Sequence, residues 1–167
     1  MSHPALLSKL KNSHSIKRLI KVWLKAGIMD NGFLERNNSG TPQGSSLSPL
    51  LANIALHGLE NETRQHLKKD LRLYKKKKWG HTGSYLTAIS IIRYADDFVV
   101  LHESEDIVQK ARVFIGQWLR KIGLELKPEK TRIAHTLFKY KQVPPGFNFL
   151  GFNIRQFTCS DRKKGYI

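Results

Sequence analysis

The chain has 167 residues, of which 29 are Lys or Arg and 13 are Asp or Glu, and this charge of +16 predicts a polyanionic partner, RNA or DNA ahead of an anionic membrane. Its hydrophobic content of 40% suffices for a core and excludes a wholly disordered chain. The sequence has no long apolar run, no apolar stretch near its start and a single cysteine, so no transmembrane helix, signal peptide or internal disulfide is expected.

The first 44 residues predict one helix, one short strand and a polar loop. An amphipathic helix is expected over residues 5–26, ended by Gly27. Its apolar residues recur with helical spacing at Ile16, Leu19, Ile20 and Trp23. The turn signal Asn31-Gly32 is followed by a strand predicted at 33–36 and a loop at 37–44.

A second helix is predicted from Ser48 to about residue 68. Ser48 is a favourable N-cap, and Pro49 suits the first helical position. The apolar residues that suggest the helix are Leu50, Leu51, Ile54, Leu59 and Leu67. Residues 68–80 are rich in lysine and are expected to be a loop or a frayed helix end that faces solvent or nucleic acid.

The middle of the chain predicts a β-hairpin with two acidic residues at its tip. Residues 87–101 hold two β-branched apolar runs on either side of Asp96-Asp97. Residues 81–110 are also the one acidic stretch of the chain, with five acidic and two basic residues. Adjacent carboxylates repel each other by about 1 kcal/mol at 4 Å in water. The pair is therefore expected either to hold a divalent cation such as Mg²⁺ or to be an ordinary solvated turn.

The last third of the chain predicts a helix followed by short extended elements. The helix is expected at about 105–122, with Ser104 as its N-cap and Gly123 as its stop. A short extended element is predicted at 124–133, and residues 147–157 predict a final strand or hairpin with Gly151 at a bulge or close approach. This order of elements favours an α+β domain with antiparallel pairing and helices on one face.

Three further segments could contact nucleic acid, and each has a plain structural alternative. The glycines of residues 40–46 would let the backbone approach a base pair, but their spacing alone favours a plain loop. Residues 127–132 hold a lysine that could act on a leaving pyrophosphate, or they form a solvated turn. Residues 75–78 could bind phosphates or be a solvated run of lysines.

Taken together, four segments resemble the motifs of reverse transcriptases, in the order in which that family carries them. They are Ser39-Gly40-Thr41-Pro42-Gln43-Gly44 with residues 48–53, Arg93-Tyr94-Ala95-Asp96-Asp97-Phe98, residues 123–126 with Lys130-Thr131, and Phe147-Asn148-Phe149-Leu150-Gly151-Phe152. The sequence is most similar to the group II intron reverse transcriptase–maturases of bacteria and organelles. The resemblance covers residues 1–157 and leaves 158–167 as a basic tail.

The resemblance implies a palm-like antiparallel sheet backed by helices and an RNA-directed DNA polymerase. Asp96 and Asp97 would hold catalytic Mg²⁺, and Lys130 would lie near the leaving pyrophosphate. The residues implied in binding template, nucleotide and primer end are Pro42, Gln43, Gly44, Tyr94 and Ala95, and those of the primer grip are Phe149, Leu150 and Gly151. The implied partners are an RNA template, expected to be intron RNA, a DNA primer and deoxynucleoside triphosphates, in bacterial cytoplasm or an organelle.

The sequence departs from the family in one respect that bears on activity. The family carries a further metal-binding Asp on a strand before the Pro-Gln-Gly segment, where this chain has only Asp30 and Glu35. We therefore expect a palm fragment that lacks the fingers, the first palm strand and the thumb, and that is inactive or weakly active alone. The alternatives are a non-catalytic RNA-binding module that assists intron splicing, or a pseudogene remnant.

Overall fold

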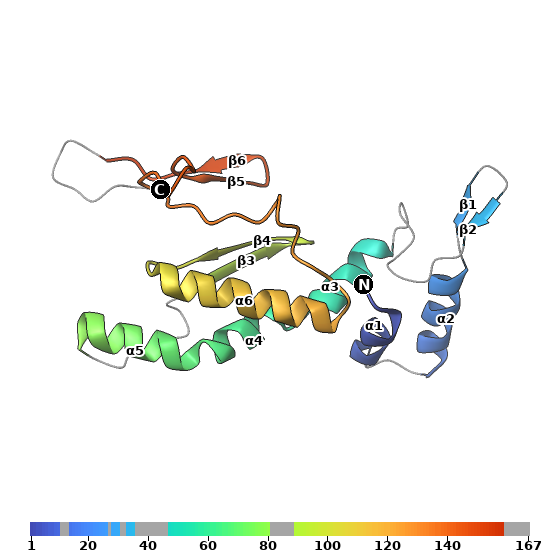
Figure 1. Ribbon diagram of the computed structural model, residues 1–167. Helices are drawn as coiled ribbons and strands as arrows, with labels where there is room; N and C mark the ends of the chain where they lie inside the picture. The colour runs from blue at the N-terminus through green and yellow to red at the C-terminus, as the bar shows by residue number, and fades with distance from the viewer. Residues whose placement is uncertain (11–13, 27, 31–32, 36–46, 81–88, 159–167) are drawn as a thin grey trace. The chain divides into compact units, whose positions relative to one another are not determined.

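A computed structural model describes residues 1–10, 14–26, 28–30, 33–35, 47–80 and 89–158. The chain divides into two compact units, Met1–Glu125 and Leu126–Ile167, and each is described by itself. The elements are α-helices and two-stranded antiparallel sheets, which confirms the predicted α+β class (Figure 1). Among the described residues, no helix is long and apolar enough to cross a bilayer.

The helix predicted over 5–26 is in fact two helices, α1 (His3–Lys9) and α2 (His14–Lys25). Helix α1 ends because Leu10 adopts an extended backbone with ψ of 108°, and the sequence continues with Asn12 and Ser13, which are weak helix formers. The fully buried side chains of Leu6 and Leu24 pack with residues of α3 (Ser48–Leu56) in one core cluster.

The strand predicted at 33–36 is present as β2 (Phe33–Glu35). It pairs with β1 (Ile28–Asp30), a strand that the sequence did not predict. The predicted helix stop at Gly27, the turn at Asn31-Gly32 and the loop at 37–44 lie outside the described residues.

The helix predicted from 48 to 68 is interrupted at His57-Gly58, so that α3 is followed by α4 (Leu59–His66). The lysine-rich segment predicted as a loop or frayed end is instead a third helix, α5 (Lys68–Trp79). That prediction was wrong because Leu71 is fully buried and fixes the segment against the core. The cluster that contains Leu71 consists of Leu67, Leu71, Ile89, Ile91, Ile107 and Ala111.

The predicted hairpin and the helix after it are both confirmed. Strand β3 (Ser90–Tyr94) pairs antiparallel with β4 (Asp97–Leu101), and α6 (Glu105–Lys121) follows, with Ser104 at its N-cap. Helix α6 contacts β4 and α4, and Figure 1 shows it running alongside the hairpin. Ile107 and Ala111 of α6 pack in the cluster that holds Ile91 of β3.

The second unit contains one regular hairpin, β5 (Phe147–Phe149) with β6 (Phe152–Ile154), as one of the two predicted alternatives. Gly151 is neither a bulge nor a close approach, because the pairing of Phe149 with Phe152 closes a regular two-residue turn and a Cβ at Gly151 would meet nothing within 4 Å. Residues 124–133, predicted as a short extended element, form no strand, and residues 128–130 are a turn.

Candidate active site

The hairpin β3–β4 places Asp96 and Asp97 at its tip. Tyr94 pairs with Asp97, so Ala95 and Asp96 form the two-residue turn between the strands. The side chains of both aspartates are exposed. The turn thus presents two neighbouring carboxylates to solvent, on a hairpin whose other end is held in the core.

The two faces of this hairpin differ in burial. Directly paired residues of antiparallel strands share a face, so Tyr94 and Asp97 lie on the same side as Ile92 and its partner Val99. We call these four residues the open face of the hairpin. Ile92 and Tyr94 are 49% and 65% exposed, whereas Ile91, on the opposite face, is 8% exposed. Asp97 therefore stands on the side of the hairpin that α6 does not cover.

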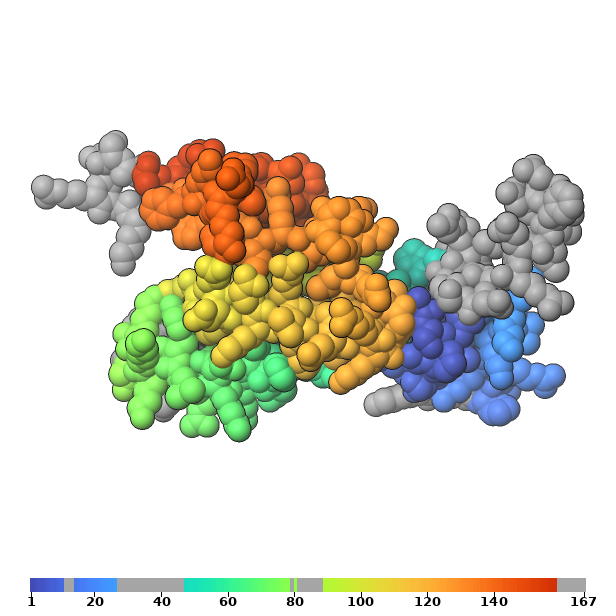
Figure 2. All heavy atoms as spheres, viewed as in Figure 1, coloured from blue at the N-terminus to red at the C-terminus, as the bar shows by residue number. Residues whose placement is uncertain are grey.

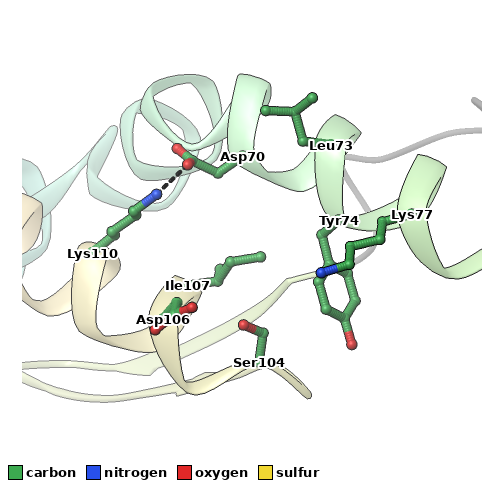
Figure 3. Close-up of a pocket in the computed structure, with 8 residues that line it drawn as sticks. All are labelled: Asp70, Leu73, Tyr74, Lys77, Ser104, Asp106, Ile107 and Lys110. Atoms are coloured by element: carbon green, nitrogen blue, oxygen red, sulfur yellow. Dashed lines mark hydrogen bonds and ion pairs between the residues drawn. The ribbon is translucent and has the colours of Figure 1, made fainter.

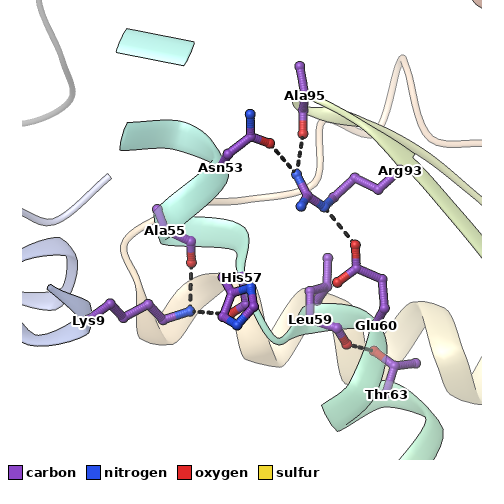
Figure 4. Close-up of polar contacts among 9 residues, drawn as sticks. All are labelled: Lys9, Asn53, Ala55, His57, Leu59, Glu60, Thr63, Arg93 and Ala95. Carbon is purple, nitrogen blue, oxygen red and sulfur yellow. Dashed lines mark hydrogen bonds and ion pairs between the residues drawn. The ribbon is translucent and has the colours of Figure 1, made fainter. Parts of the chain in front are cut away.

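Arg93, on the covered face, ties the turn to two helices (Figure 4). Its Nε donates a hydrogen bond of 2.7 Å to Oε1 of Glu60 in α4. Its Nη1 donates to Oδ1 of Asn53 in α3 at 2.8 Å and to the carbonyl oxygen of Ala95 at 3.0 Å. One guanidinium group thereby fixes the turn relative to α3 and α4.

The ion pair between Arg93 and Glu60 is largely shielded from water. The two side chains are 15% and 24% exposed. Burial raises the pKa of Glu60, but the hydrogen bond from Arg93, a backbone hydrogen bond and the charges of Arg93 and Arg64 outweigh it, so the pKa lies below its ordinary value. The pair is therefore expected to remain ionised at neutral pH.

Ala95 occupies a strained conformation within the turn. Its φ of +52° lies in the left-handed region, which costs an L-residue with a Cβ about 1–2 kcal/mol. The hydrogen bond from Arg93 to the carbonyl oxygen of Ala95 acts on this same residue. Strained residues of this kind persist where the surrounding structure fixes them, and they cluster at functional sites.

The donors at the turn fit a hard divalent cation. Asp96 and Asp97 supply adjacent carboxylate oxygens, the ligand type that Mg²⁺ prefers. Within the described part of the chain, no lysine or arginine forms a salt bridge with either aspartate, so their charge is not neutralised by a protein cation there. The described residues hold no group of three or more His, Cys, Asp or Glu side chains suited to a metal. A cation bound to the pair would complete its shell with water or substrate phosphates.

A second contact, centred on Lys9, supports the helix that carries Asn53. Nζ of Lys9 donates to the carbonyl oxygens of Ala55 and His57, at 2.7 and 2.8 Å, near the end of α3. The same ammonium lies 4.3 Å from the ring centroid of Trp118 in α6. Burial lowers the pKa of Lys9, and the nearby charge of Glu62 opposes this change.

The other residues implied in the site are distributed over the chain. Pro42, Gln43 and Gly44 lie outside the described residues. Lys130 belongs to the second unit, where it has an exposed side chain and its backbone N–H donates to the carbonyl oxygen of Lys127.

Phe149 ends β5, and Leu150 and Gly151 form the turn of that hairpin. The structure therefore brings Tyr94, Ala95, Asp96 and Asp97 together on one turn, which belongs to the first unit.

The sequence did not identify Asn53, Glu60 and Arg93 as a set that holds this turn. Asn53 and Arg93 are 40 residues apart, and no local pattern connects them. One signal was available, because Arg93 is one of only two basic residues in the acidic stretch 81–110 and directly precedes the Tyr-Ala-Asp-Asp segment.

Comparison with known proteins gives the chain clear relatives. The family described as "Reverse transcriptase (RNA-dependent DNA polymerase)" matches residues 1–154. The chain is 29% identical over 187 residues to the group II intron-encoded protein LtrA of Lactococcus lactis subsp. cremoris, an alignment that covers 84% of this chain and 30% of LtrA.

It is 30% identical over 176 residues to protein YkfC of Escherichia coli (91% of this chain, 42% of YkfC). It is 27% identical over 214 residues to an uncharacterised 91 kDa protein in the cob intron of Schizosaccharomyces pombe (97% of this chain, 25% of that protein). The chain thus spans between a quarter and about two fifths of the length of these relatives.

Proposed function

The chain belongs to the reverse transcriptase family, and from this membership we propose that it forms part of an RNA-directed DNA polymerase of the group II intron reverse transcriptase–maturase type. The observation that carries the proposal is the turn at Asp96-Asp97, which presents two carboxylates on an exposed hairpin tip within the matched residues. Two relatives, from Lactococcus and fission yeast, are named as intron proteins, which supports the intron type.

In the proposed reaction, the 3′-hydroxyl of a DNA primer attacks the α-phosphate of a deoxynucleoside triphosphate, and pyrophosphate leaves. Asp96 and Asp97 are the residues that hold two Mg²⁺ ions. Bound divalent ions supply charge stabilisation of the attacking and leaving oxygens in such an in-line displacement. Tyr94, on the open face beside Asp97, contacts the primer end together with Ala95. Arg93 keeps the turn in place while these contacts form.

The remaining proposed roles follow the motifs. Pro42, Gln43 and Gly44 shape the pocket for the template base and the incoming nucleotide. Lys130 offers a proton or a positive charge to the leaving pyrophosphate, and its exposed side chain is consistent with that role. Phe149, Leu150 and Gly151, at the tip of the β5–β6 hairpin, support the primer strand. The proposed RNA template is intron RNA.

A second candidate function is RNA binding without catalysis, in support of intron splicing. The observations that favour it are the net charge of +16 and the meeting of only two described carboxylates at the turn. Two carboxylates leave much of the charge of two divalent ions uncompensated, so we expect weak metal binding and low activity from this chain alone.

Primer extension separates the two functions. The chain is incubated with an RNA template, an annealed DNA primer, deoxynucleotides and Mg²⁺, and binding of Mn²⁺ is followed in parallel by electron paramagnetic resonance. We expect weak extension that is lost in Asp96→Asn and Asp97→Asn, with a lowered Mn²⁺ affinity. Glu125→Gln serves as the control, because Glu125 is an exposed carboxylate outside the hairpin.

Extension that survives in both aspartate variants would refute the proposed metal ligands. RNA binding by a chain that neither extends the primer nor binds Mn²⁺ would establish the second function instead. Robust extension by the unaltered chain would contradict the expectation that two carboxylates are too few.

A further inference from the structure

Helix α5 carries a cluster of positive charge on its outer side. Four of its residues form what we call the α5 basic face, and all four side chains are exposed: Lys68, Lys69, Arg72 and Lys76. Their spacing puts them on one side of the helix, because successive residues turn by about 100°. Leu71, on another side, is fully buried in the core. Figure 2 shows the surface of α5, drawn in green.

Two carboxylates near α5 form ion pairs with lysines that do not belong to this face. Asp70, the one carboxylate within α5, forms an ion pair with Lys110 of α6 (Figure 3). Glu103, which precedes α6, forms an ion pair with Lys78. A pocket of about 240 Å³ lies between α5 and the start of α6, but its lining includes both Asp106 and Lys77, so it does not offer a uniformly positive site. The α5 basic face itself carries no carboxylate.

The helix is also fixed to the hairpin that carries the proposed catalytic turn. Leu67 and Leu71 pack in one cluster with Ile89 and Ile91, at the start of β3. The hydroxyl of Tyr74 donates to Glu103, just after β4, at 3.3 Å. The turn at Ala95-Asp96 lies at the other end of the hairpin, where Arg93 contacts α3. Whatever binds the α5 basic face is therefore held firmly relative to the turn but away from it.

We propose that the α5 basic face is an RNA-docking surface that holds the sugar-phosphate backbone of the template at a distance from the proposed catalytic turn. The inference rests on the proposed function for its choice of RNA as the occupant. Four cations on one side of a rigid helix complement a row of phosphates. The face has no aromatic side chain on which a base could stack, since Tyr74 is turned toward His102 and Glu103. Binding there is independent of sequence.

The chain itself supplies a matched control. Helix α2 carries Lys17, Arg18, Lys21 and Lys25, which repeat the intervals of the α5 basic face and likewise face mainly to solvent. Residues of α2 pack in the other core cluster, which holds no residue of the hairpin. Removing the four cations of α2 therefore lowers the net charge as much as removing those of α5, and the two variants differ only in where the charge is lost.

The test measures the affinity for a fluorescein-labelled 20-base-pair RNA duplex by anisotropy at several salt concentrations. The α5 variant is Lys68→Gln, Lys69→Gln, Arg72→Gln and Lys76→Gln together, and the α2 variant replaces its four cations by Gln. Glutamine keeps most of the helix propensity of lysine, and circular dichroism checks that both variants fold. For the α5 variant, the negative slope of log affinity against log salt should become shallower by about 3. The affinity at physiological salt should fall by about tenfold or more.

The α2 variant should retain most of the affinity and slope. An equal loss in both variants would show that net charge alone attracts RNA and would overturn the proposal, as would an unchanged affinity in the α5 variant. Loss of binding to anionic lipid vesicles with unchanged RNA binding would assign the face to a membrane instead. Mn²⁺ binding should be unaltered in the α5 variant. If the chain neither extends a primer nor binds Mn²⁺, the proposed polymerase function fails, while the RNA comparison still decides the role of α5.

Discussion

Replacing Arg93 by methionine is expected to cost about 3–4 kcal/mol of unfolding free energy. An exposed ion pair is worth about 1 kcal/mol or less, and breaking a fully buried one costs about 3–5 kcal/mol. The pair of Arg93 and Glu60, at 15% and 24% exposed, lies between these limits, at about 2 kcal/mol. The lost hydrogen bonds to Asn53 and to the carbonyl oxygen of Ala95 each add up to about 1 kcal/mol, which gives the upper end of the expected range.

The loss is measured by urea unfolding followed by circular dichroism. Arg112→Met is the matched control, because Arg112 is exposed on α6, and it should change stability by no more than about 0.5 kcal/mol. A double-mutant cycle with Glu60→Gln should give a coupling energy of about 1–2 kcal/mol. Equal costs for the two arginine variants, or a coupling energy near zero, would refute the view that Arg93 fixes the turn.

The same pair predicts a dependence of stability on pH. The pKa of Glu60 is lower in the folded chain than its ordinary value of about 4.3, so the unfolded chain binds more protons in the interval between the two values. The stabilisation is complete above the unfolded-state pKa and is lost as the pH falls through the folded-state pKa. The stability difference between the unaltered chain and Glu60→Gln should therefore be constant near neutral pH and shrink below about pH 4. A difference that does not change on acidification would contradict the lowered pKa.

Three further substitutions test the scaffold around the hairpin. Gly123→Ala should lower the unfolding free energy by about 2 kcal/mol and Gly80→Ala by about 1 kcal/mol. Both glycines have φ near +70°, so both variants are strained. Only a Cβ at Gly123 would also clash, because it would lie 2.9 Å from the backbone nitrogen of Ser2, whereas a Cβ at Gly80 would meet nothing within 4 Å. Thermal unfolding of the two variants measures the difference, and equal costs would disprove the clash. Lys9→Met should lower the unfolding free energy, measured with urea, by about 2 kcal/mol. The reason is that the carbonyl oxygens at the end of α3, such as that of Ala55, lose a charged hydrogen-bond donor. A cost below about 0.5 kcal/mol would show that water replaces the ammonium.

The elements that the sequence predicted correctly are those whose signals are local. The hairpin followed from the β-branched runs on either side of Asp96-Asp97, and α6 followed from its apolar spacing between Ser104 and Gly123. Helix α5 was missed because its run of lysines is typical of a solvated segment. What fixes it is the burial of Leu71 against Ile89 and Ile91, a contact between residues far apart in the sequence that no local pattern contains.

The candidate site was predictable to a similar extent. Asp96 and Asp97 could be placed at a turn from the sequence, since two adjacent acids interrupt an apolar pattern. The contacts that hold the turn could not, because Arg93 reaches back to residues of two helices, and those contacts depend on how the helices pack. Nor did the sequence indicate that Ala95, which has no glycine-like freedom, would take a positive φ in this turn.

The two faces of the hairpin make it possible to separate chemistry from folding. Asp97 and Tyr94 lie on the open face, so substituting them removes few packing contacts and should leave unfolding free energy nearly unchanged. Arg93 lies on the covered face and fixes the same turn through partly buried hydrogen bonds, so its loss should lower stability and, by loosening the turn, also weaken Mn²⁺ binding. Arg93→Lys keeps the charge but not the planar fork of donors, so it should restore part of the stability and less of the metal affinity. That order of effects follows only if the position of the turn, and not its charge alone, prepares the two carboxylates for a cation.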